Sequence, residues 1–437
     1  MRLLGICLLA AMVADRPRSD WPRFLGPAGD GTSPETGLNW KWPKAGPPKL
    51  WECELGFGYA PPTVAGGKLF HFDRVGDSAR LTCRDAATGA EVWKYEYPTR
   101  YEDLYGYDPG PRACPVVDGE RVYVHGVDGV LACVSVADGK EVWRTDTKAA
   151  YHVHQNFFGA GGSPLVDGDV LIVPVGGSPK GPRPADLRDA KPDGTCVVGF
   201  DKRTGKEKYR VGMDLASYAT PVIATVGGKR TGLYFARGGL LGFDPQTGAE
   251  AFRFPWRAKK HDSVNAANPL VAGDKVLVTE CYEKGAALLD LASGKPAVAW
   301  SDADREPNEK AMMAHWCTPV RVGGYVYGCS GQHPNDADLR CVELATGEVK
   351  WRERRTSRCT LIHVDGHLVS LGEIGELRVF KPNPDRYEEV TRWEVPGIGY
   401  PSWAPPVVSR GRLYLRGKDE TRRDGHKLMC FDLLAAN

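Results

Sequence analysis

The sequence predicts an all-β fold, an eight-bladed β-propeller whose blades are four-stranded antiparallel sheets. Three observations lead to this prediction. A repeat recurs about every 49 residues, most copies contain a glycine turn followed by an aromatic residue, and apolar residues alternate along short segments throughout the chain. No stretch shows the helical periodicity of about 3.6 residues, which excludes an architecture of alternating strands and helices.

Each repeat opens with a short apolar segment that we expect to form the innermost strand of a blade. The first opening is Pro62-Thr63-Val64 and the eighth is Pro406-Val407-Val408, 344 residues later over seven steps. The resulting period of about 49 residues lies in the range of propeller blades. The six openings between them begin at Pro115, Pro164, Pro221, Pro269, Pro319 and Thr360.

The second half of each repeat is a hairpin that ends on an aromatic side chain. In the first copy a strand ending at Asp85 leads to the turn Thr88-Gly89 and then to a strand that closes on Trp93. Glycine supplies the positive φ that a tight hairpin needs. The later copies close on Trp143, Tyr209, Phe252, Trp300 and Trp351, and a seventh keeps Trp393 but has Asn383-Pro384-Asp385 in place of the glycine turn.

The eighth repeat ends before its outer strand. We expect residues 49–55 (KLWECEL) to supply that strand and to close the ring non-covalently, which protects the strand edges of the first and last blades. The propeller is therefore assigned to residues 47–437. Residues 15–46, which include Trp21 and Phe24, are expected to form a strap packed on the propeller, and 176–194 a long surface loop.

The first residues and the composition predict an exported protein. Arg2 is followed by an apolar run from Leu3 to Ala14, shorter than a membrane span of about 20 residues and typical of a signal peptide, here residues 1–14. No later segment is apolar enough for a transmembrane helix. The net charge of +2 gives no electrostatic signature of nucleic-acid binding. We expect a periplasmic or otherwise exported location.

The twelve cysteines do not form a metal or redox motif. There is no Cys-x-x-Cys pair, and four cysteines recur at one position of the repeat, where a thiol serves as a small buried apolar group: Cys83, Cys133, Cys341 and Cys430.

The pattern Asp85-x-x-Thr88-Gly89-x-x-x-Trp93 resembles the tryptophan-docking repeat of alcohol dehydrogenases that depend on pyrroloquinoline quinone (PQQ). It is also similar to the PQQ-like repeats of BamB, the outer-membrane protein assembly factor, and the resemblance extends from about residue 47 to the end of the chain. It implies that each tryptophan packs its blade on the next one. The residues given this structural role are Trp51, Trp93, Trp143, Trp300, Trp351 and Trp393.

The sequence departs from both families. The dehydrogenases carry adjacent cysteines over the quinone and a Glu, Asn and Asp set that holds calcium, whereas this chain has no Cys-Cys pair and no clear set of that kind. PQQ with calcium is therefore an alternative cofactor rather than a prediction. Cys7 follows Ile6 instead of a small residue, so the lipid-anchor motif of BamB is not matched either.

The candidate binding residues precede the innermost strands, which places them around one mouth of the central channel. The guanidinium group of arginine binds carboxylates, and aromatic rings provide faces for stacking. These residues would therefore bind a small planar anionic ligand such as a quinone. The alternative is that they plug the channel and cap strand ends. The set is Tyr59, Arg112, Ser163, Tyr218, Asn265, Asn268, His315, Trp316, Arg358 and Trp403.

Two other segments contain residues that could bind a metal ion or a protein. His152 and His154 alternate on an expected extended segment and are weak candidates for metal ligands, but no third ligand accompanies them, which favours a hydrogen-bonding loop. The acidic, tyrosine-rich loop 101–107 (YEDLYGY) suits protein recognition, although local packing is the default interpretation.

No hydrolase, phosphate-loop or dinucleotide motif occurs in the chain. We expect a non-catalytic binding or scaffold role in the cell envelope, with a protein partner. The alternative is an oxidoreductase dependent on PQQ or another small ligand, with its site at the channel mouth, and a propeller that binds sugars or polyanions ranks third.

Overall fold

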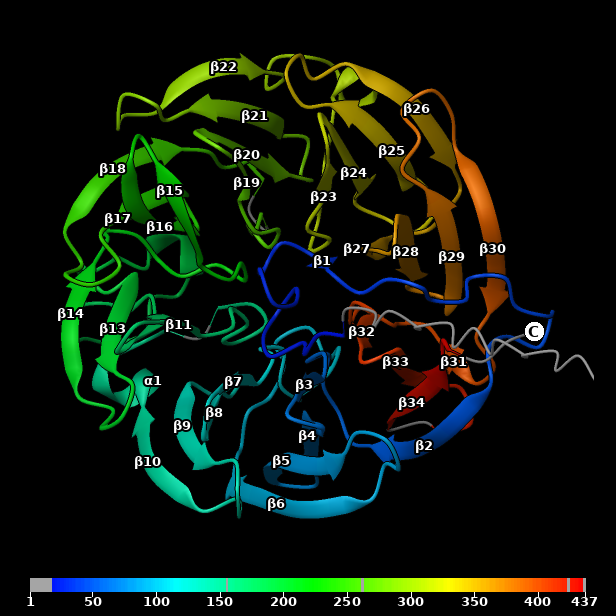
Figure 1. Ribbon diagram of the computed structural model, residues 1–437. Helices are drawn as coiled ribbons and strands as arrows, with labels where there is room; N and C mark the ends of the chain where they lie inside the picture. The colour runs from blue at the N-terminus through cyan, green and yellow to red at the C-terminus, as the bar shows by residue number, and fades with distance from the viewer. Residues whose placement is uncertain (1–17, 155, 261–262, 423–424, 435–437) are drawn as a thin grey trace, which may run out of the picture.

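The computed structural model describes residues 18–154, 156–260, 263–422 and 425–434. The expected signal peptide, residues 1–14, lies outside these ranges. Eight antiparallel sheets surround one axis (Figure 1), which confirms the predicted all-β propeller of eight blades. In the described ranges the helical elements are α1 (Thr147–Ala150) and two single 3₁₀ turns, Leu187–Asp189 and Pro307–Glu309, and none is long enough to cross a membrane.

The first four blades each run from an inner to an outer strand in chain order. Blade 1 contains β3 (Thr63–Ala65), β4 (Lys68–Val75), β5 (Ser78–Asp85) and β6 (Glu91–Pro98). Blade 2 contains β7 (Val116–Asp118), β8 (Arg121–His125), β9 (Val130–Ser135) and β10 (Glu141–Asp146). Blade 3 contains β11 (Leu165–Asp167), β12 (Val170–Pro174), β13 (Val197–Asp201) and β14 (Glu207–Val211). Blade 4 contains β15 (Val222–Val226), β16 (Lys229–Phe235), β17 (Gly239–Phe243) and β18 (Glu250–Pro255).

The other four blades repeat this order, with additions in the last two. Blade 5 contains β19 (Leu270–Ala272), β20 (Lys275–Glu280), β21 (Gly285–Asp290) and β22 (Ala297–Ser301). Blade 6 contains β23 (Val320–Val322), β24 (Tyr325–Ser330), β25 (Asp338–Glu343) and β26 (Val349–Arg354). Blade 7 contains β27 (Cys359–Val364), β28 (His367–Gly372), β29 (Glu376–Lys381) and β30 (Glu388–Glu394). Blade 8 contains β32 (Val407–Ser409), β33 (Arg412–Asp419), β34 (His426–Asp432) and β2 (Lys49–Leu55), with β31 (Ile398–Gly399) also paired to β33.

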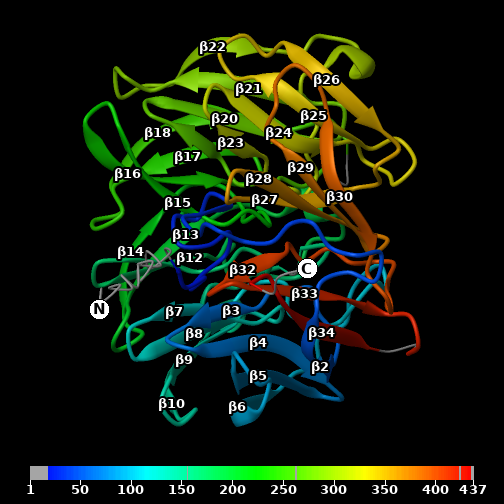
Figure 2. The same ribbon diagram turned by 45° about the vertical axis from the view of Figure 1, so that its right-hand side comes forward.

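The ring is closed by β2, as the sequence predicts. This strand pairs antiparallel with β34, with Lys49 opposite Phe431 and Leu55 opposite His426. Figures 1 and 2 show the blue β2 beside the red β34. Trp51 and Leu55 are buried, whereas Leu50 is exposed, so the strand packs one face on the ring. The strand that precedes blade 1 in the sequence therefore forms the outer edge of blade 8.

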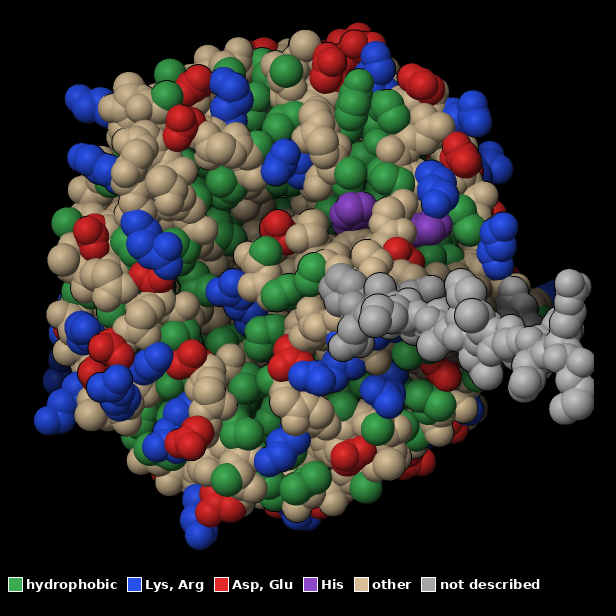
Figure 3. Space-filling view, viewed as in Figure 1, with side chains coloured by type: hydrophobic (Ala, Val, Ile, Leu, Met, Phe, Trp, Pro, Cys, Tyr) green, Lys and Arg blue, Asp and Glu red, His purple; other side chains and the backbone are tan. Residues whose placement is uncertain are grey.

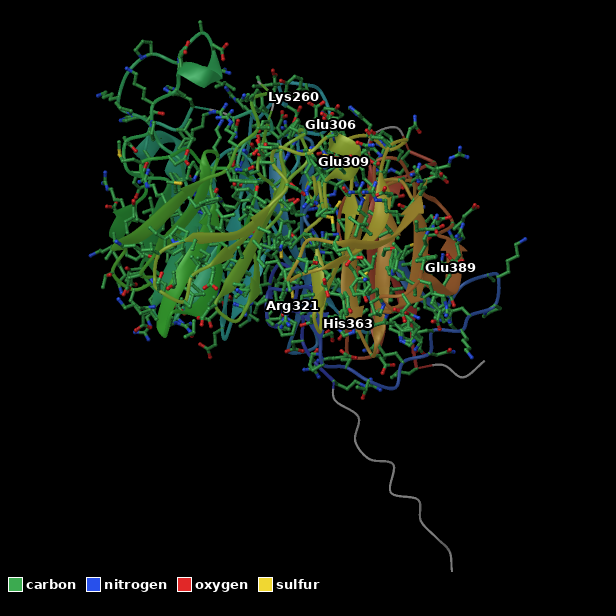
Figure 4. The ribbon with its side chains drawn as sticks, turned by 90° about the horizontal axis from the view of Figure 1, so that it is seen from above. Lys260, Glu306, Glu309, Arg321, His363 and Glu389 are labelled. Atoms are coloured by element: carbon green, nitrogen blue, oxygen red, sulfur yellow. The ribbon has the colours of Figure 1, made fainter. Side chains whose placement is uncertain are left out.

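Residues 18–46 run across one end of the channel. β1 (Thr32–Ser33) pairs parallel with β27, where Thr32 lies opposite His363 at the end of that inner strand. Trp21 is buried and forms a bridge to Val64. In Figure 4, His363 lies beside this blue strap, and Lys260 lies at the opposite end of the propeller. The inner strands therefore start at the open mouth and finish under the strap.

The tryptophans that close the outer strands contact the next blade. Five of the indole Nε1 groups donate to a turn carbonyl there: Trp51 to Ala86 at 3.2 Å, Trp93 to Val136 at 3.0 Å, Trp143 to Lys202 at 3.2 Å, Trp300 to Leu344 at 2.8 Å and Trp351 to Asn383 at 2.8 Å. Tyr209 replaces tryptophan in blade 3 and donates to Pro245 at 2.8 Å. Trp393 makes no such bond within the described residues and packs edge-on against Phe431, with ring centroids 5.1 Å apart.

The described cysteines are all free thiols, and Cys83, Cys133, Cys341 and Cys430 are fully buried at the repeated strand position. On the strap side, acidic and basic side chains alternate over the visible surface (Figure 3), which agrees with the nearly balanced charge.

Candidate binding site at the channel mouth

A cavity of about 390 Å³ occupies the centre of the propeller and extends from the open mouth of the channel to the strap. The residues that precede the inner strands line it, and Phe24 and Leu25 of the strap also contribute to its wall. Of the sequence-predicted residues, those that line the cavity are Tyr59, Arg112, Ser163, Tyr218, His315, Trp316, Arg358 and Trp403. The repeat spacing thus brings side chains up to 344 residues apart into one cavity.

Aromatic side chains are the largest group in the lining, and many of their rings contact one another around the wall. Neighbouring centroids lie 4.6–6.0 Å apart, within the range of favourable aromatic pairs. The chain of contacts runs through Tyr218, Phe158, Tyr107, Trp403, Trp316, His315 and Tyr282, and Tyr59 packs on Trp403. Such a wall offers ring faces to a flat ligand.

Arg358, at the start of blade 7, is bound to Glu373. Its Nε and Nη2 donate to the two carboxylate oxygens at 2.8 and 2.6 Å, and Trp403 Nε1 donates to Glu373 at 3.0 Å. The guanidinium also lies over the ring of Trp316, 4.4 Å from its centroid. Burial alone would lower the pKa of Arg358, but Glu373 raises it above the usual value. The positive charge is therefore kept, and it is neutralised inside the protein.

Arg112 is neutralised in the same way. Its Nη2 donates to Asp103 at 2.6 Å and to the carbonyl of Asp108 at 2.8 Å, and its Nη1 donates to the carbonyl of Gly110 at 2.6 Å. Asp103 is buried in this ion pair. These bonds join Arg112 to Asp103 in the loop 101–107 and to Asp108 directly after it, within the connection between blades 1 and 2. The cavity therefore has two arginines in its wall, but each has its own carboxylate.

His315 is held between two neighbours. Its Nδ1 lies 3.3 Å from Arg358 Nη1 and its Nε2 lies 3.0 Å from Tyr282 Oη. Burial, with the charges of Arg358 and His333, lowers the pKa of His315 to about 3. The ring is neutral at physiological pH, and because the guanidinium can only donate, Nδ1 accepts and Nε2 carries the proton.

Asn265 and Asn268 lie outside this cavity. The Asn265 amide donates to the carbonyls of Ala236 at 2.7 Å and Trp256 at 3.2 Å. Asn268 Oδ1 accepts from the backbone N–H of Thr220 at 2.8 Å. Both asparagines hold strand entries in place, which is the strand-capping alternative that the sequence left open.

The Asn268 bond belongs to a series that links five consecutive blades at one repeat position. The backbone N–H of one blade donates to a side-chain oxygen of the next: Cys114 to Ser163 at 2.9 Å, Ser163 to Thr220 at 3.0 Å, Thr220 to Asn268 at 2.8 Å and Asn268 to Thr318 at 2.9 Å. These bonds fix the inner strands relative to one another and so set the width of the cavity.

Several lining residues were not predicted from the sequence. Phe157 and Phe158 follow the histidine segment in blade 3, and Tyr282 lies in the turn between β20 and β21. They are distant from the strand starts, so the repeat spacing gives no signal for them. Tyr105 and Tyr107 belong to the tyrosine-rich loop, whose unusual composition is the signal that could have placed them at the mouth.

The expected extended segment with two histidines is instead a turn. His152 is exposed and has a φ of 51°, and His154 is half-buried and lines a second, smaller cavity. Throughout the described ranges no three His, Cys, Asp or Glu side chains are arranged to hold a metal ion.

Comparison with known proteins agrees with the repeat and the fold. The family model described as outer membrane protein assembly factor BamB matches residues 45–179 and 192–395, well over half of the chain. The chain belongs to the BamB family. This confirms the resemblance to PQQ-like propellers.

Individual relatives are more distant. The quinohemoprotein alcohol dehydrogenase ADH-IIG of Pseudomonas putida is 28% identical over 154 residues, which are 35% of this chain and 19% of the enzyme. The chain therefore matches about a fifth of the length of this curated relative.

Two solved structures share the architecture. BamB from Moraxella catarrhalis has a TM-score of 0.57 at 14% identity, covering 89% of this chain and 98% of that one. The dehydrogenase ADHIIG from P. putida HK5 has a TM-score of 0.67 at 14% identity, covering 96% and 81%. At this identity the structures show a common fold, and fold alone does not transfer activity.

The cavity wall does not suit PQQ with calcium. An anionic quinone needs unpaired cations, whereas Arg112 and Arg358 are neutralised by Asp103 and Glu373. Calcium needs several oxygen ligands, including carboxylates, and both carboxylates are occupied by arginines. The size and the aromatic wall suit a flat ring, but the charge distribution favours an uncharged one.

Proposed function

We propose that this BamB-family propeller is a non-catalytic binding protein of the cell envelope. Its channel-mouth cavity binds an uncharged aromatic ring of a ligand. The observation that carries the proposal is the continuous aromatic wall in which both arginines are already paired with carboxylates. A flat uncharged aromatic ring gains binding free energy in such a cavity, both from stacking on the wall and from burial of its apolar surface.

The ring has two possible sources, a free small molecule or a side chain of a protein partner. Exposed apolar side chains occur in the segments that flank the cavity lining, and they support the second source: Leu104, Tyr105, Tyr107, Ile374 and Tyr400. Aromatic residues are enriched in protein interfaces. The family description as an assembly factor favours a protein partner and an exported location.

The alternative function is an oxidoreductase dependent on PQQ, which the similarity to a quinohemoprotein alcohol dehydrogenase favours. It requires the ion pairs of Arg112 and Arg358 to open so that the quinone carboxylates replace Asp103 and Glu373. It also requires calcium ligands beyond those two carboxylates.

Isothermal titration with two uncharged probes tests the proposal. Menadione represents a free ring, and a tripeptide Gly-Trp-Gly with both termini blocked represents a partner's side chain. We expect saturable binding of at least one probe, and the stronger probe identifies the source of the ring.

The Tyr107→Ala variant locates the binding. Tyr107 is 55% exposed and contacts Trp403 and Phe158, so its removal spares the core but deletes one stacking face. We expect a two- to tenfold loss of affinity, about 0.5–1.5 kcal/mol. Val298→Ala on the outer strand β22, 52% exposed, is the matched control and should leave affinity unchanged. Absence of saturation with both probes, or equal affinity in Tyr107→Ala, would contradict the proposal.

A further inference from the structure

A separate cavity of about 240 Å³ lies between the strap and the propeller, and we call it the strap cavity. Residues 23, 24, 28 and 29 of the strap form one side of its wall, and the inner strands β11 and β15 form the other. It meets the aromatic cavity at Phe24 and Thr220, which line both. The polar side chains in its wall are those of Arg23, Asp167, Thr220, Arg230 and Asn268.

Two of the three charges in this wall neutralise each other. Asp167 is buried, and its carboxylate accepts from Nε and Nη2 of Arg230. Its Oδ2 also accepts from Gln246 Nε2 at 2.6 Å. Both oxygens of Asp167 are therefore occupied, and the pair adds no net charge to the strap cavity.

Arg23 is the charge that is left over. Its Nε donates to the carbonyl of Gly26 at 3.4 Å and its Nη2 to the carbonyl of Pro27 at 2.5 Å, both within the strap. Within the described residues Arg23 forms no ion pair, and its Nη1 donates to no group and is not enclosed by protein atoms. Burial lowers the pKa of Arg23 and the charge of Asp30 opposes this shift, but a guanidinium remains protonated at neutral pH.

Asn268 presents a second unused donor. The residue is 3% exposed, and because its Oδ1 accepts from the backbone N–H of Thr220 at 2.8 Å, its Nδ2 is the free end of the amide. This Nδ2 donates to no group among the described residues and is not enclosed by protein atoms. Of the three cavities described above, Asn268 lines only the strap cavity. A buried amide is costly without a hydrogen-bond partner, so this donor indicates a ligand or water in the cavity.

We propose that the strap cavity binds a small oxyanion, a carboxylate or a phosphate, that accepts hydrogen bonds from Arg23 Nη1 and Asn268 Nδ2. The strap cavity has what the aromatic cavity lacks, a cation without its own carboxylate. Its volume of about 240 Å³ holds the anionic group together with a small body such as a sugar ring. The site does not depend on the function proposed for the aromatic cavity.

Isothermal titration with inorganic phosphate and with D-glucuronate tests this site. D-glucose is the uncharged counterpart of glucuronate, and sodium chloride at equal ionic strength is the reference. We expect saturable heat with phosphate or glucuronate and none with glucose or chloride. The anion that binds more tightly shows whether the group is a phosphate or a carboxylate.

Two variants locate the binding. Arg23→Gln removes the unpaired cation and should lower the affinity at least about tenfold, as expected for loss of a charge-assisted hydrogen bond. Asn268→Asp keeps the oxygen that accepts from Thr220 but replaces the free donor by a carboxylate oxygen, so it should abolish binding. Arg203→Gln makes the same change of charge at a side chain that is 73% exposed, and it should bind like the wild type.

Cooperative urea unfolding shows that each variant is folded before it is titrated. If Asn268→Asp does not fold, Arg23→Gln decides, because Arg23 lies on the strap and is only half-buried. Phosphate and glucuronate that give no more heat than chloride, or an affinity that is unchanged in Arg23→Gln, would overturn the proposal.

Discussion

Gly205 and Gly294 occupy the same turn position in two blades, but only Gly205 faces an indole ring. Both have positive φ, 70° and 77°. A Cβ at Gly205 would lie 2.6 Å from the ring of Trp143, whereas a Cβ at Gly294 would meet nothing within 4 Å. The comparison separates backbone strain from the docking contact between blades.

Alanine at these two glycines should therefore have unequal effects. Both substitutions incur the cost of left-handed backbone, about 1–2 kcal/mol, and Gly205→Ala adds about 1–3 kcal/mol from overpacking against Trp143. Urea unfolding should show the larger loss of stability for Gly205→Ala. Equal losses would mean that the indole contact does not constrain the turn.

The candidate site shows what the sequence can predict at this scale. The repeat gives each residue its position along a blade, and Trp316 and Arg358, which precede two inner strands, both line the cavity. The repeat does not tell in which direction a side chain points. It therefore could not predict that the side chains of Asn265 and Asn268 point away from the cavity and form hydrogen bonds with backbone groups. It also cannot find Phe158, which reaches the cavity from a loop without repeat register.

At the scale of elements, the closing strand β2 is the least local part of the fold, since it pairs with β34 more than 370 residues later. Its presence could be predicted because the eighth repeat lacks an outer strand and residues 49–55 carry the pattern of one. The strap could be recognised only as a packed segment. Its exact path depends on contacts such as Trp21 with Val64, which have no repeat to reveal them.

The stability of the closed propeller should depend on Trp51 of the closing strand. Its ring packs on the turn of blade 1 and its Nε1 donates to Ala86, so Trp51→Ala should cost about 3–5 kcal/mol. Leu50→Ala, at a neighbouring residue that is 45% exposed, should change stability by less than about 0.5 kcal/mol. Unfolding in urea measures both. A small effect of Trp51→Ala would indicate that the ring is held closed by backbone pairing alone.

At the scale of the whole molecule, buried histidines couple stability to pH. Burial is the main cause that lowers the pKa of His71 and His315 to about 3 and of His125 to about 4, compared with about 6.5 when unfolded. Between pH 6.5 and 4 the unfolded chain binds protons that the folded chain does not. The stability from these neutral histidines is thus complete above pH 6.5 and is lost as the pH falls.

The urea midpoint should therefore fall between pH 7 and pH 5. Each histidine contributes a slope of up to about 1.4 kcal/mol per pH unit below pH 6.5, and His71→Gln should remove one such contribution. Asp214 and Glu280, whose pKa values burial raises, oppose the loss within their own titration range. A midpoint that stays constant from pH 7 to 5 would show that the histidines are protonated in the folded protein.

The most direct test of the account is to extend the isothermal titration of the wild-type protein to PQQ, with and without calcium, beside the two uncharged probes. Because Arg112 and Arg358 are neutralised by Asp103 and Glu373, we predict that menadione or the blocked tripeptide binds more tightly than PQQ and that calcium has no effect. Tighter binding of PQQ that calcium strengthens would contradict the account and would establish the oxidoreductase alternative as the one to pursue.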